Sequence, residues 1–289
     1  ANPIIERWSV DSPFEPLFVD TQAIATIAVN RVPIDATTTP EQLSVINRER
    51  GLALDPEELI AVREHFSQRG VHPTDVELET IAQTWSEHCA HKTFRANITT
   101  ESGASRPSLI NQLRASTDKI NALYVVSSFV GNAGIISFTP GRTLAVKCET
   151  HNHPSAIEPF GGANTGVGGV IRDIMGAQHT PIACTNILCF GPPDTDTLTL
   201  PEGVFPPRRT RDGVIDGIAD YGNKIGLPTV AGAVLYDSGY TANPLVYAGC
   251  IGTSNSYIDQ VVPQPRDRIV VLGGRTGRDG LRGATFSSM

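Results

Sequence analysis

The stretch KCETHNHPSAIEPFGGANTGVGGVIRD, from Lys147 to Asp173, contains two histidines, two glutamates, one lysine, an Arg-Asp pair and five glycines. Alternate side chains of a strand share a face and repeat every ~7 Å. The alternation at the start of the stretch predicts one ionisable face and one face suited to a core. The ionisable face would hold Lys147, Glu149, His151 and, if the strand lasts that far, His153. The opposite, core-facing side would hold Val146, Cys148 and Thr150.

Three kinds of surface fit the ionisable face. The first is a solvated strand, which needs no chemistry. The second is a zinc site of a hydrolase, with His151 and His153 as two imidazole ligands. That site needs a third ligand, and it leaves Lys147 unexplained because its charge would repel the metal.

The third is a phosphoryl-transfer site. The run GGANTGVGG predicts a glycine loop whose N–H groups approach a phosphate, followed by a helix over Val170–Ala177 whose N-terminus favours an anion. The run matches neither the Walker loop nor the dinucleotide fingerprint. Lys147 would bind a phosphate, Glu149 and Asp173 would bind Mg²⁺, and a histidine would transfer a proton. This interpretation accounts for most of the residues.

Composition excludes several other classes. The 289 residues are 40% apolar, enough for a core, and the net charge of −7 argues against a broad nucleic-acid surface. The apolar runs are too short for a membrane span, and the five cysteines show no CxxC spacing. We therefore expect a reduced, cytoplasmic protein without nucleic-acid or membrane partners. Because the chain starts at Ala1 and stops after a strand over Asp267–Gly274 and a glycine loop, we expect a fragment of something longer.

Strand and helix signals alternate irregularly along the chain. Asp55 and Thr74 each predict the N-cap of a helix, and we expect the apolar stripe of the second helix to continue to His88 or Cys89. Further helices are expected over most of Ser105–Val130 and from Asp212 to Gly226. Strands are expected at Ile135–Phe138, Leu144–Thr150, Pro181–Phe190, Thr229–Tyr236 and Leu245–Gly252. This order indicates a mixed α/β domain (α+β).

KCETHNHPSAIEPFGGANTGVGGVIRDIMGA resembles the signature of the phosphoribosylformylglycinamidine synthase family, ATP-dependent amidotransferases of purine biosynthesis. WSEHCAHKTF, GNAGI, LPTVAGAVLYDSGYTANPLV and GGRTGRDGLRGATFSS resemble further blocks in the family's order. The resemblance implies a carbon-nitrogen ligase that converts formylglycinamide ribonucleotide, ATP and glutamine-derived ammonia into formylglycinamidine ribonucleotide, ADP and phosphate. The amide oxygen would be activated by phosphoryl transfer before ammonia displaces phosphate.

The resemblance also implies roles for individual residues. His151 would be the catalytic histidine and His88 a second one, and Lys147 would contact ATP. His91 would be a second ATP contact, at a position where some members carry tyrosine. Glu149 and Asp173 would hold Mg²⁺. The substrate site would be lined by Thr150, Asn152, His153 and Arg172.

The implied fold is the N-terminal domain of the aminoimidazole ribonucleotide synthetase-like fold, whose strands form a β-barrel on pairing with a second copy. We expect a linker segment over residues 1–54, linker helices and the ATP- and substrate-binding domain over 55–260, and a truncated C-terminal domain from 261. The expected partners are the missing remainder of the synthase, a glutaminase domain or subunit, and a second copy of this chain. We expect little turnover from the fragment alone, and a non-catalytic binding or scaffold fragment is the alternative.

Overall fold

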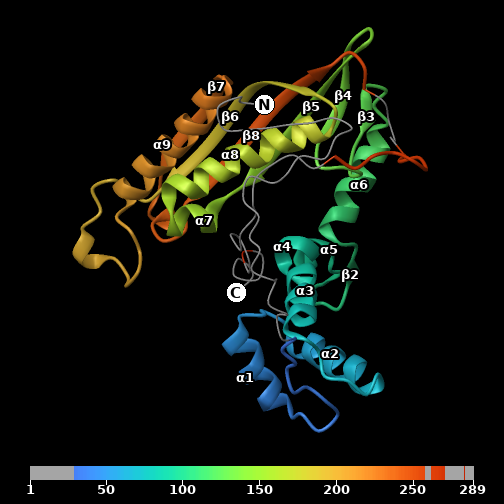
Figure 1. The fold of residues 1–289 in the computed structure, drawn as a ribbon. Helices are drawn as coiled ribbons and strands as arrows, with labels where there is room; N and C mark the ends of the chain where they lie inside the picture. Colours follow the sequence, from blue (N-terminus) through green and yellow to red (C-terminus); the bar gives the residue numbers. More distant parts are fainter. Residues whose placement is uncertain (1–28, 258–261, 271–282, 284–289) are drawn as a thin grey trace, which may run out of the picture. The chain divides into compact units, whose positions relative to one another are not determined.

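The computed structural model describes residues 29–257, 262–270 and 283, and these fall into two compact units (Figure 1). We call the described residues up to Lys92, together with Gly283, the helical unit. We call the described residues from Thr93 onward, Gly283 excepted, the sheet unit. None of the described helices is long and apolar enough to cross a membrane.

The helical unit is built from capped helices around one apolar core. Its helices are α1 (Pro40–Arg50), α2 (Pro56–Gln68), α3 (Asp75–Trp85) and α4 (Glu87–Ala90). As predicted, Asp55 and Thr74 cap α2 and α3, each in a capping box whose third helical residue is a glutamate. Leu43, Val62, Phe66 and Leu78 are among the core side chains, and each is at most 3% exposed.

The expected continuation of the α3 stripe to His88 is wrong. Helix α3 ends at Trp85, and Ser86 then takes an extended conformation and caps α4 with its side chain. The Ser86 hydroxyl both accepts from the Cys89 N–H and donates to the Gln83 carbonyl, so it restarts the helix in a new direction. His88 is consequently exposed rather than part of a buried stripe.

The sheet unit contains a six-stranded sheet in the order β3-β4-β5-β8-β6-β7, antiparallel except for the parallel β6-β7 pair. Its strands are β3 (Val125–Ser127), β4 (Gly134–Thr139), β5 (Arg142–Thr150), β6 (Thr180–Phe190), β7 (Thr229–Tyr236) and β8 (Leu245–Ser254). Its longer helices are α6 (Leu109–Ile120), α8 (Pro159–Gly176) and α9 (Pro207–Ile225). The shorter elements are helix α7 (Asn152–Ile157) and the 3₁₀ turns η1 (Thr197–Thr199) and η2 (Ser238–Tyr240). Strands β1 (Ile98–Thr99) and β2 (Ser105–Arg106) form a separate two-stranded sheet. The short helix α5 (Lys92–Arg95) contains the boundary between the two units. The mixed α/β prediction is therefore confirmed.

Several predicted boundaries are wrong. Only Leu109–Ile120 of the expected Ser105–Val130 helix is α-helical, and Val125–Ser127 forms a strand instead. Helix α9 begins at Pro207, ahead of the predicted Asp212 cap, because proline suits the first turn of a helix. It ends, as predicted, at Gly226, whose φ of 77° is left-handed.

The two faces of β5 are used in the opposite way from the prediction. Helix α8 packs against β5, β8 and β6, and α9 packs beside it against β6 (Figure 1). Ala145, Lys147 and Glu149 alternate on the side that faces α8, where Lys147 meets Asp173 of that helix. Val146, on the predicted core side, is 41% exposed. The ionisable face is thus covered by a helix, while the apolar face is open.

The predicted glycine loop is also wrong, because GGANTGVGG lies inside α8. A side-chain carbon at Gly166 would come within 2.8 Å of the His151 Cβ, and one at Gly168 would come within 2.8 Å of the Tyr221 ring on α9. Such distances are shorter than real contacts between carbon atoms allow. The glycines therefore let α8 lie directly against its neighbours rather than expose backbone to a ligand.

The predicted strand over Asp267–Gly274 is not formed in its described part. Residues 267–270 have no strand pairing, and Ile269 is 94% exposed. Residues 271–274 lie outside the described residues.

Gly217 on α9 offers a direct test of this close packing. A methyl group there would overlap the backbone carbonyl of Phe160 on α8, which cannot move without shifting the helix. We expect Gly217→Ala to lower the free energy of unfolding by about 2 kcal/mol, even though alanine favours helix. Chemical denaturation measures this change.

Gly169→Ala is the matched control, because nothing lies within 4 Å of a side-chain carbon at that position of α8. Helix propensity should raise its free energy of unfolding by about 0.5–1 kcal/mol. Equal destabilisation by both substitutions would contradict the packing account.

Candidate functional site

Lys147 and two carboxylates form a compact charged cluster between β5 and α8. The Lys147 Nζ lies 3.0 Å from Glu149 Oε2 and 3.0 Å from Asp173 Oδ2. The two acids therefore share one ammonium, although 24 positions separate them in the sequence. The side chains of Lys147 and Asp173 are 18% and 21% exposed, and that of Glu149 is 41% exposed. The sequence-predicted cation and both acids are thus brought together.

The environment of Lys147 keeps it charged. Burial by itself would lower the pKa of Lys147, because a low-dielectric surrounding disfavours the ammonium form. Hydrogen bonds to Glu149 and Asp173, together with their negative charges, outweigh burial and raise the pKa above its ordinary value of 10.5. The cluster therefore carries one positive and two negative charges, and its net charge of about −1 suits a further cation.

His151 lies at the end of β5 and not on the predicted strand face. The strand ends at Thr150, and His151 is the N-cap residue of α7. Its N–H donates to the Val246 carbonyl at 2.7 Å, and its own carbonyl accepts from the Ser155 hydroxyl at 2.7 Å. Together with the bare Gly166 that faces its Cβ, these bonds fix the backbone of His151 at the end of the sheet.

Asn152 and Thr150 are held differently from the cluster. The Asn152 Oδ1 accepts the Val246 N–H at 2.8 Å, so this oxygen links α7 to β8. Thr150 is exposed and, by strand alternation, lies on the open face opposite Lys147 and Glu149. Thr150 therefore does not share one face of β5 with Lys147 and Glu149.

His153 lies in the first turn of α7 and lines a hollow of about 370 Å³. The hollow is also lined by Glu202, Phe205, Thr210 and Thr241. Arg172 precedes Asp173 on α8 and is exposed to solvent. His153 is thus near polar groups that could bind a ligand, while Arg172 contributes a cation at the surface.

His88 and His91 belong to the helical unit. His88 is exposed on the single turn of α4, and His91 ends that turn in the left-handed conformation, with φ of 53°. The catalytic role of His88 and the ATP contact of His91 stay predictions.

The N-terminus of α8 does not serve as an anion site. Its N-cap is Glu158, whose carboxylate accepts the Gly161 N–H. A carboxylate of the chain itself therefore occupies the position that the predicted phosphate would take.

The described residues give no support to the zinc site. His151 and His153 lie on a helix cap and in the following helix, not side by side on a strand. Within the part of the chain that the structure describes, no group of three or more His, Cys, Asp or Glu side chains is arranged to hold a metal.

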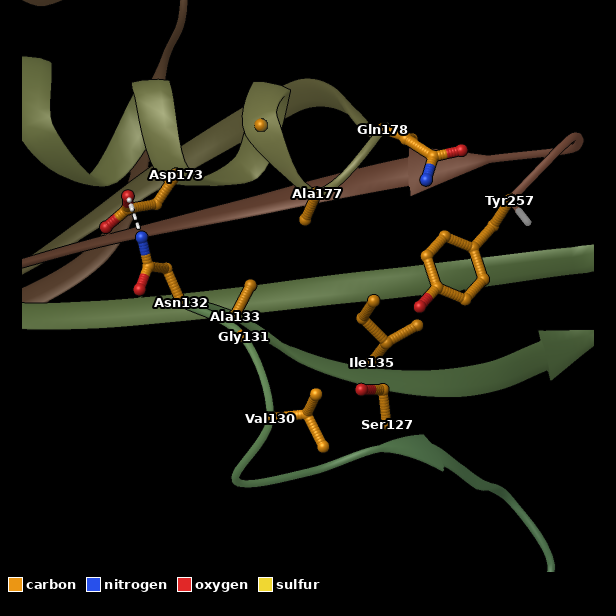
Figure 2. A pocket seen from close by; sticks show the side chains of 11 residues that line it. Ser127, Val130, Gly131, Asn132, Ala133, Ile135, Asp173, Ala177, Gln178 and Tyr257 are labelled. Carbon is orange, nitrogen blue, oxygen red and sulfur yellow. Dashed lines mark hydrogen bonds between the residues drawn. The ribbon is translucent and has the colours of Figure 1, made fainter. Parts of the chain in front are cut away.

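Asn132 is a neighbour of the cluster that the sequence prediction missed. Its Nδ2 donates to Asp173 Oδ1 at 3.2 Å, and both residues border a hollow of about 300 Å³ (Figure 2). Ile135, Ala177 and Tyr257 line the same hollow (Figure 2). The only sequence signal was the GNAGI block, which contains Asn132 but no charged residue.

Comparison with known proteins confirms the family resemblance. Residues 43–92 match the formylglycinamide ribonucleotide amidotransferase linker domain. Residues 130–254 match the AIR synthase related protein, N-terminal domain, in agreement with the fold prediction.

Two curated relatives illustrate the similarity. Phosphoribosylformylglycinamidine synthase subunit PurL of Thermoplasma acidophilum is 40% identical over 253 residues, which cover 86% of this chain and 30% of the relative. The Caulobacter vibrioides PurL subunit is 36% identical over 257 residues, which cover 88% of this chain and 31% of the relative. The chain thus spans about 30% of the length of the curated relatives that it matches.

Two solved structures show a similar fold. T. maritima PurL complexed with FGAR has a TM-score of 0.55 and 35% identity, covering 78% of this chain and 31% of that protein. T. maritima PurL complexed with ADP has a TM-score of 0.55 and 34% identity, covering 78% of this chain and 32% of that protein.

The raised pKa of Lys147 predicts a pH dependence of stability. Because the folded pKa lies above the ordinary 10.5, the contribution of Lys147 is complete below 10.5 and is lost as pH rises through the folded value. We expect the wild type to lose more unfolding free energy than Lys147→Met between pH 10 and the folded pKa. Denaturation at a series of alkaline pH values measures the difference, and parallel curves would contradict it.

Proposed function

We propose that this chain, a homologue of part of phosphoribosylformylglycinamidine synthase subunit PurL, contributes ATP- and Mg²⁺-binding residues to that synthase. The observation that carries the proposal is the shared contact of Lys147 with Glu149 and Asp173, at 3.0 Å each. The whole enzyme would convert formylglycinamide ribonucleotide, ATP and ammonia into formylglycinamidine ribonucleotide, ADP and phosphate. The names of the PurL complexes with FGAR and ADP support this choice of substrates.

Glu149 and Asp173 are the residues that would hold Mg²⁺. Magnesium prefers carboxylate oxygen ligands and is commonly bound through one or two carboxylates plus substrate phosphates. Glu149 and Asp173 each place a carboxylate oxygen 3.0 Å from the same ammonium, and this shared contact is what supports them as a ligand pair. When bound, the ion would neutralise charge on the transferring phosphoryl group.

Lys147 would bind a phosphate of ATP. Its ammonium is compact and charged, and only 18% of the side chain is exposed, so its attraction to a phosphate is weakly screened. In this role it would hold the phosphoryl group close to the amide oxygen of the substrate. His91, which belongs to the helical unit, would be the second ATP contact.

His151 would move a proton during the reaction, because it directly follows β5 and stands two residues after Glu149. Ordinary histidine titrates near neutral pH, which suits general acid and base catalysis. His88 would be a second catalytic histidine. The substrate would be held by Thr150, Asn152, His153 and Arg172, of which His153 already lines a hollow.

The rest of the activity would come from outside this chain. The relatives are about three times as long as the matched region, so we expect little or no turnover from these 289 residues alone. Ammonia would come from a glutaminase domain or subunit. A cytoplasmic location fits purine biosynthesis.

A second candidate function is a non-catalytic binding fragment of the same fold. The cluster argues against it, because scaffolding alone has no need to hold two acids around one half-buried lysine.

The open face of the sheet supports association with a second copy of this fold. Val146, Ile187 and Leu235 lie on the face opposite α8 and are 41%, 41% and 55% exposed. Burying such a face against another sheet would stabilise the pair by about 25 cal/mol per Å² of apolar surface. A β-barrel formed by two such sheets would also remove their free edges.

Isothermal titration calorimetry with Mg²⁺-ATP tests the proposed function. We expect the wild type to bind, and we expect Asp173→Asn to bind at least about tenfold more weakly because one metal ligand loses its charge. Asp212→Asn is the control, since this exposed α9 residue pairs only locally with Arg211. No binding by the wild type, or equal binding by all three proteins, would contradict the proposal.

Multi-angle light scattering tests the association through the open face. We expect wild-type chain to form dimers or larger species, and we expect Ile187→Lys to shift it toward monomer by placing a charge on that face. Val230→Lys is the comparison, because it adds the same charge on the edge strand β7. A monodisperse wild-type monomer would contradict this part of the proposal.

A further inference from the structure

The two oxygens of Asp173 have different partners. Oδ2 contacts the Lys147 ammonium at 3.0 Å, and Oδ1 accepts a hydrogen bond from Asn132 Nδ2 at 3.2 Å. Figure 2 shows the Asn132 amide turned toward the Asp173 carboxylate. Both oxygens of the Asp173 carboxylate are therefore held. Oδ2 contacts the same Lys147 ammonium that Glu149 contacts.

Both ends of the Asn132 contact are anchored in the core. Asn132 precedes Ala133 and Ile135, which are 7% and 4% exposed and belong to the same apolar cluster as Ile171 and Ile174 of α8. Asp173 lies between these last two residues, each 0% exposed. The hydrogen bond itself is exposed, but it joins positions 41 residues apart that each adjoin buried core residues, so the packing on both sides constrains its geometry.

An amide suits the task of supporting a metal ligand. It donates a hydrogen bond to the carboxylate without adding a second positive charge beside that of Lys147. It also leaves the negative charge of Asp173 intact. Hydrogen-bond partners of this kind orient metal ligands and commonly change metal affinity about 10–100-fold when removed.

We propose that Asn132 is a positioning residue that holds Asp173 Oδ1 so that Oδ2 is presented to a divalent cation beside Glu149. This inference rests on the proposed function, which makes Asp173 a metal ligand. Asn132 itself does not touch the cation. The Lys147 ammonium contacts the same Oδ2 at 3.0 Å.

Mn²⁺ binding to the 289-residue chain, measured by electron paramagnetic resonance without nucleotide, tests the inference. We expect Asn132→Leu to weaken Mn²⁺ binding about tenfold, since an apolar side chain of similar size cannot orient Asp173. Asn132→Ala gives the same test with a smaller side chain, in case the leucine perturbs the turn. Thermal unfolding of each variant reports stability separately, because a purely structural tie would lower the melting temperature and leave Mn²⁺ affinity unchanged.

Asn255→Leu is the matched control. Asn255 accepts a hydrogen bond from Arg142 at 2.9 Å at the other end of β5, away from the carboxylates. We expect this substitution to leave Mn²⁺ affinity within twofold of the wild type. A tenfold loss in Asn255→Leu as well would overturn the inference, because the effect would then not be specific to Asn132.

Asp173→Asn separates the failure of the inference from the failure of the proposed function. If Asp173→Asn loses Mn²⁺ binding while both Asn132 variants keep it, positioning by Asn132 is wrong and the metal assignment stands. If Asp173→Asn binds Mn²⁺ as well as the wild type, both are wrong. If the wild type does not bind Mn²⁺ without nucleotide, the inference is wrong, and the Mg²⁺-ATP titration decides the proposed function separately. Adding Asn132→Leu to Asp173→Asn should cause no further loss, because the two residues would act through one carboxylate.

Discussion

The close approach of α8 to the sheet is the constraint on which the candidate site depends. Asp173 can contact Lys147 because α8 lies directly over β5. Helix α8 can lie so close because it presents glycines, which have no side chain, to the residues packed against it. Gly166 faces the Cβ of His151, and Gly168 faces the ring of Tyr221. Larger side chains at these positions would increase the distance between α8 and the sheet, and the Asp173 carboxylate would then move away from Lys147.

The electrostatics of the cluster follow from that packing. The carboxylates of Glu149 and Asp173 would repel each other, and burying the Lys147 ammonium without a partner would cost desolvation free energy. The ion pairs of Lys147 with both carboxylates offset the repulsion and the desolvation. The remaining negative charge is what a divalent cation would find attractive. The stability of this region and the proposed function therefore both depend on the same three side chains.

Much of the fold was predictable because local signals agreed with the final packing. Asp55 and Thr74 cap their helices as expected, and the strand that ends at Thr150 has the predicted alternation. Alternation could not predict which face of this strand a helix covers, because the alternating pattern is the same in either case. The glycines of α8 were misread because they act in helix packing, which requires knowledge of the partner helix.

The charged residues of the candidate site could be predicted from the sequence, but the asparagine that contacts Asp173 could not. Lys147, Glu149 and Asp173 stand out in sequence because acids and a lysine are unusual so close to a core strand and an apolar helix. Asn132 gives no such signal, since a single asparagine in a glycine-containing turn is common. Its contact with Asp173 depends on a chain reversal that only the folded sheet reveals.

A double-mutant cycle between Lys147 and Asp173 tests the central claim most directly. The free energies of unfolding of Lys147→Met, Asp173→Asn and the double variant would be compared with that of the wild type near neutral pH. The account predicts a favourable coupling of about 1 kcal/mol or more, because the contact is 3.0 Å long and both side chains are mostly buried. Additive effects, with no coupling between the two positions, would contradict it.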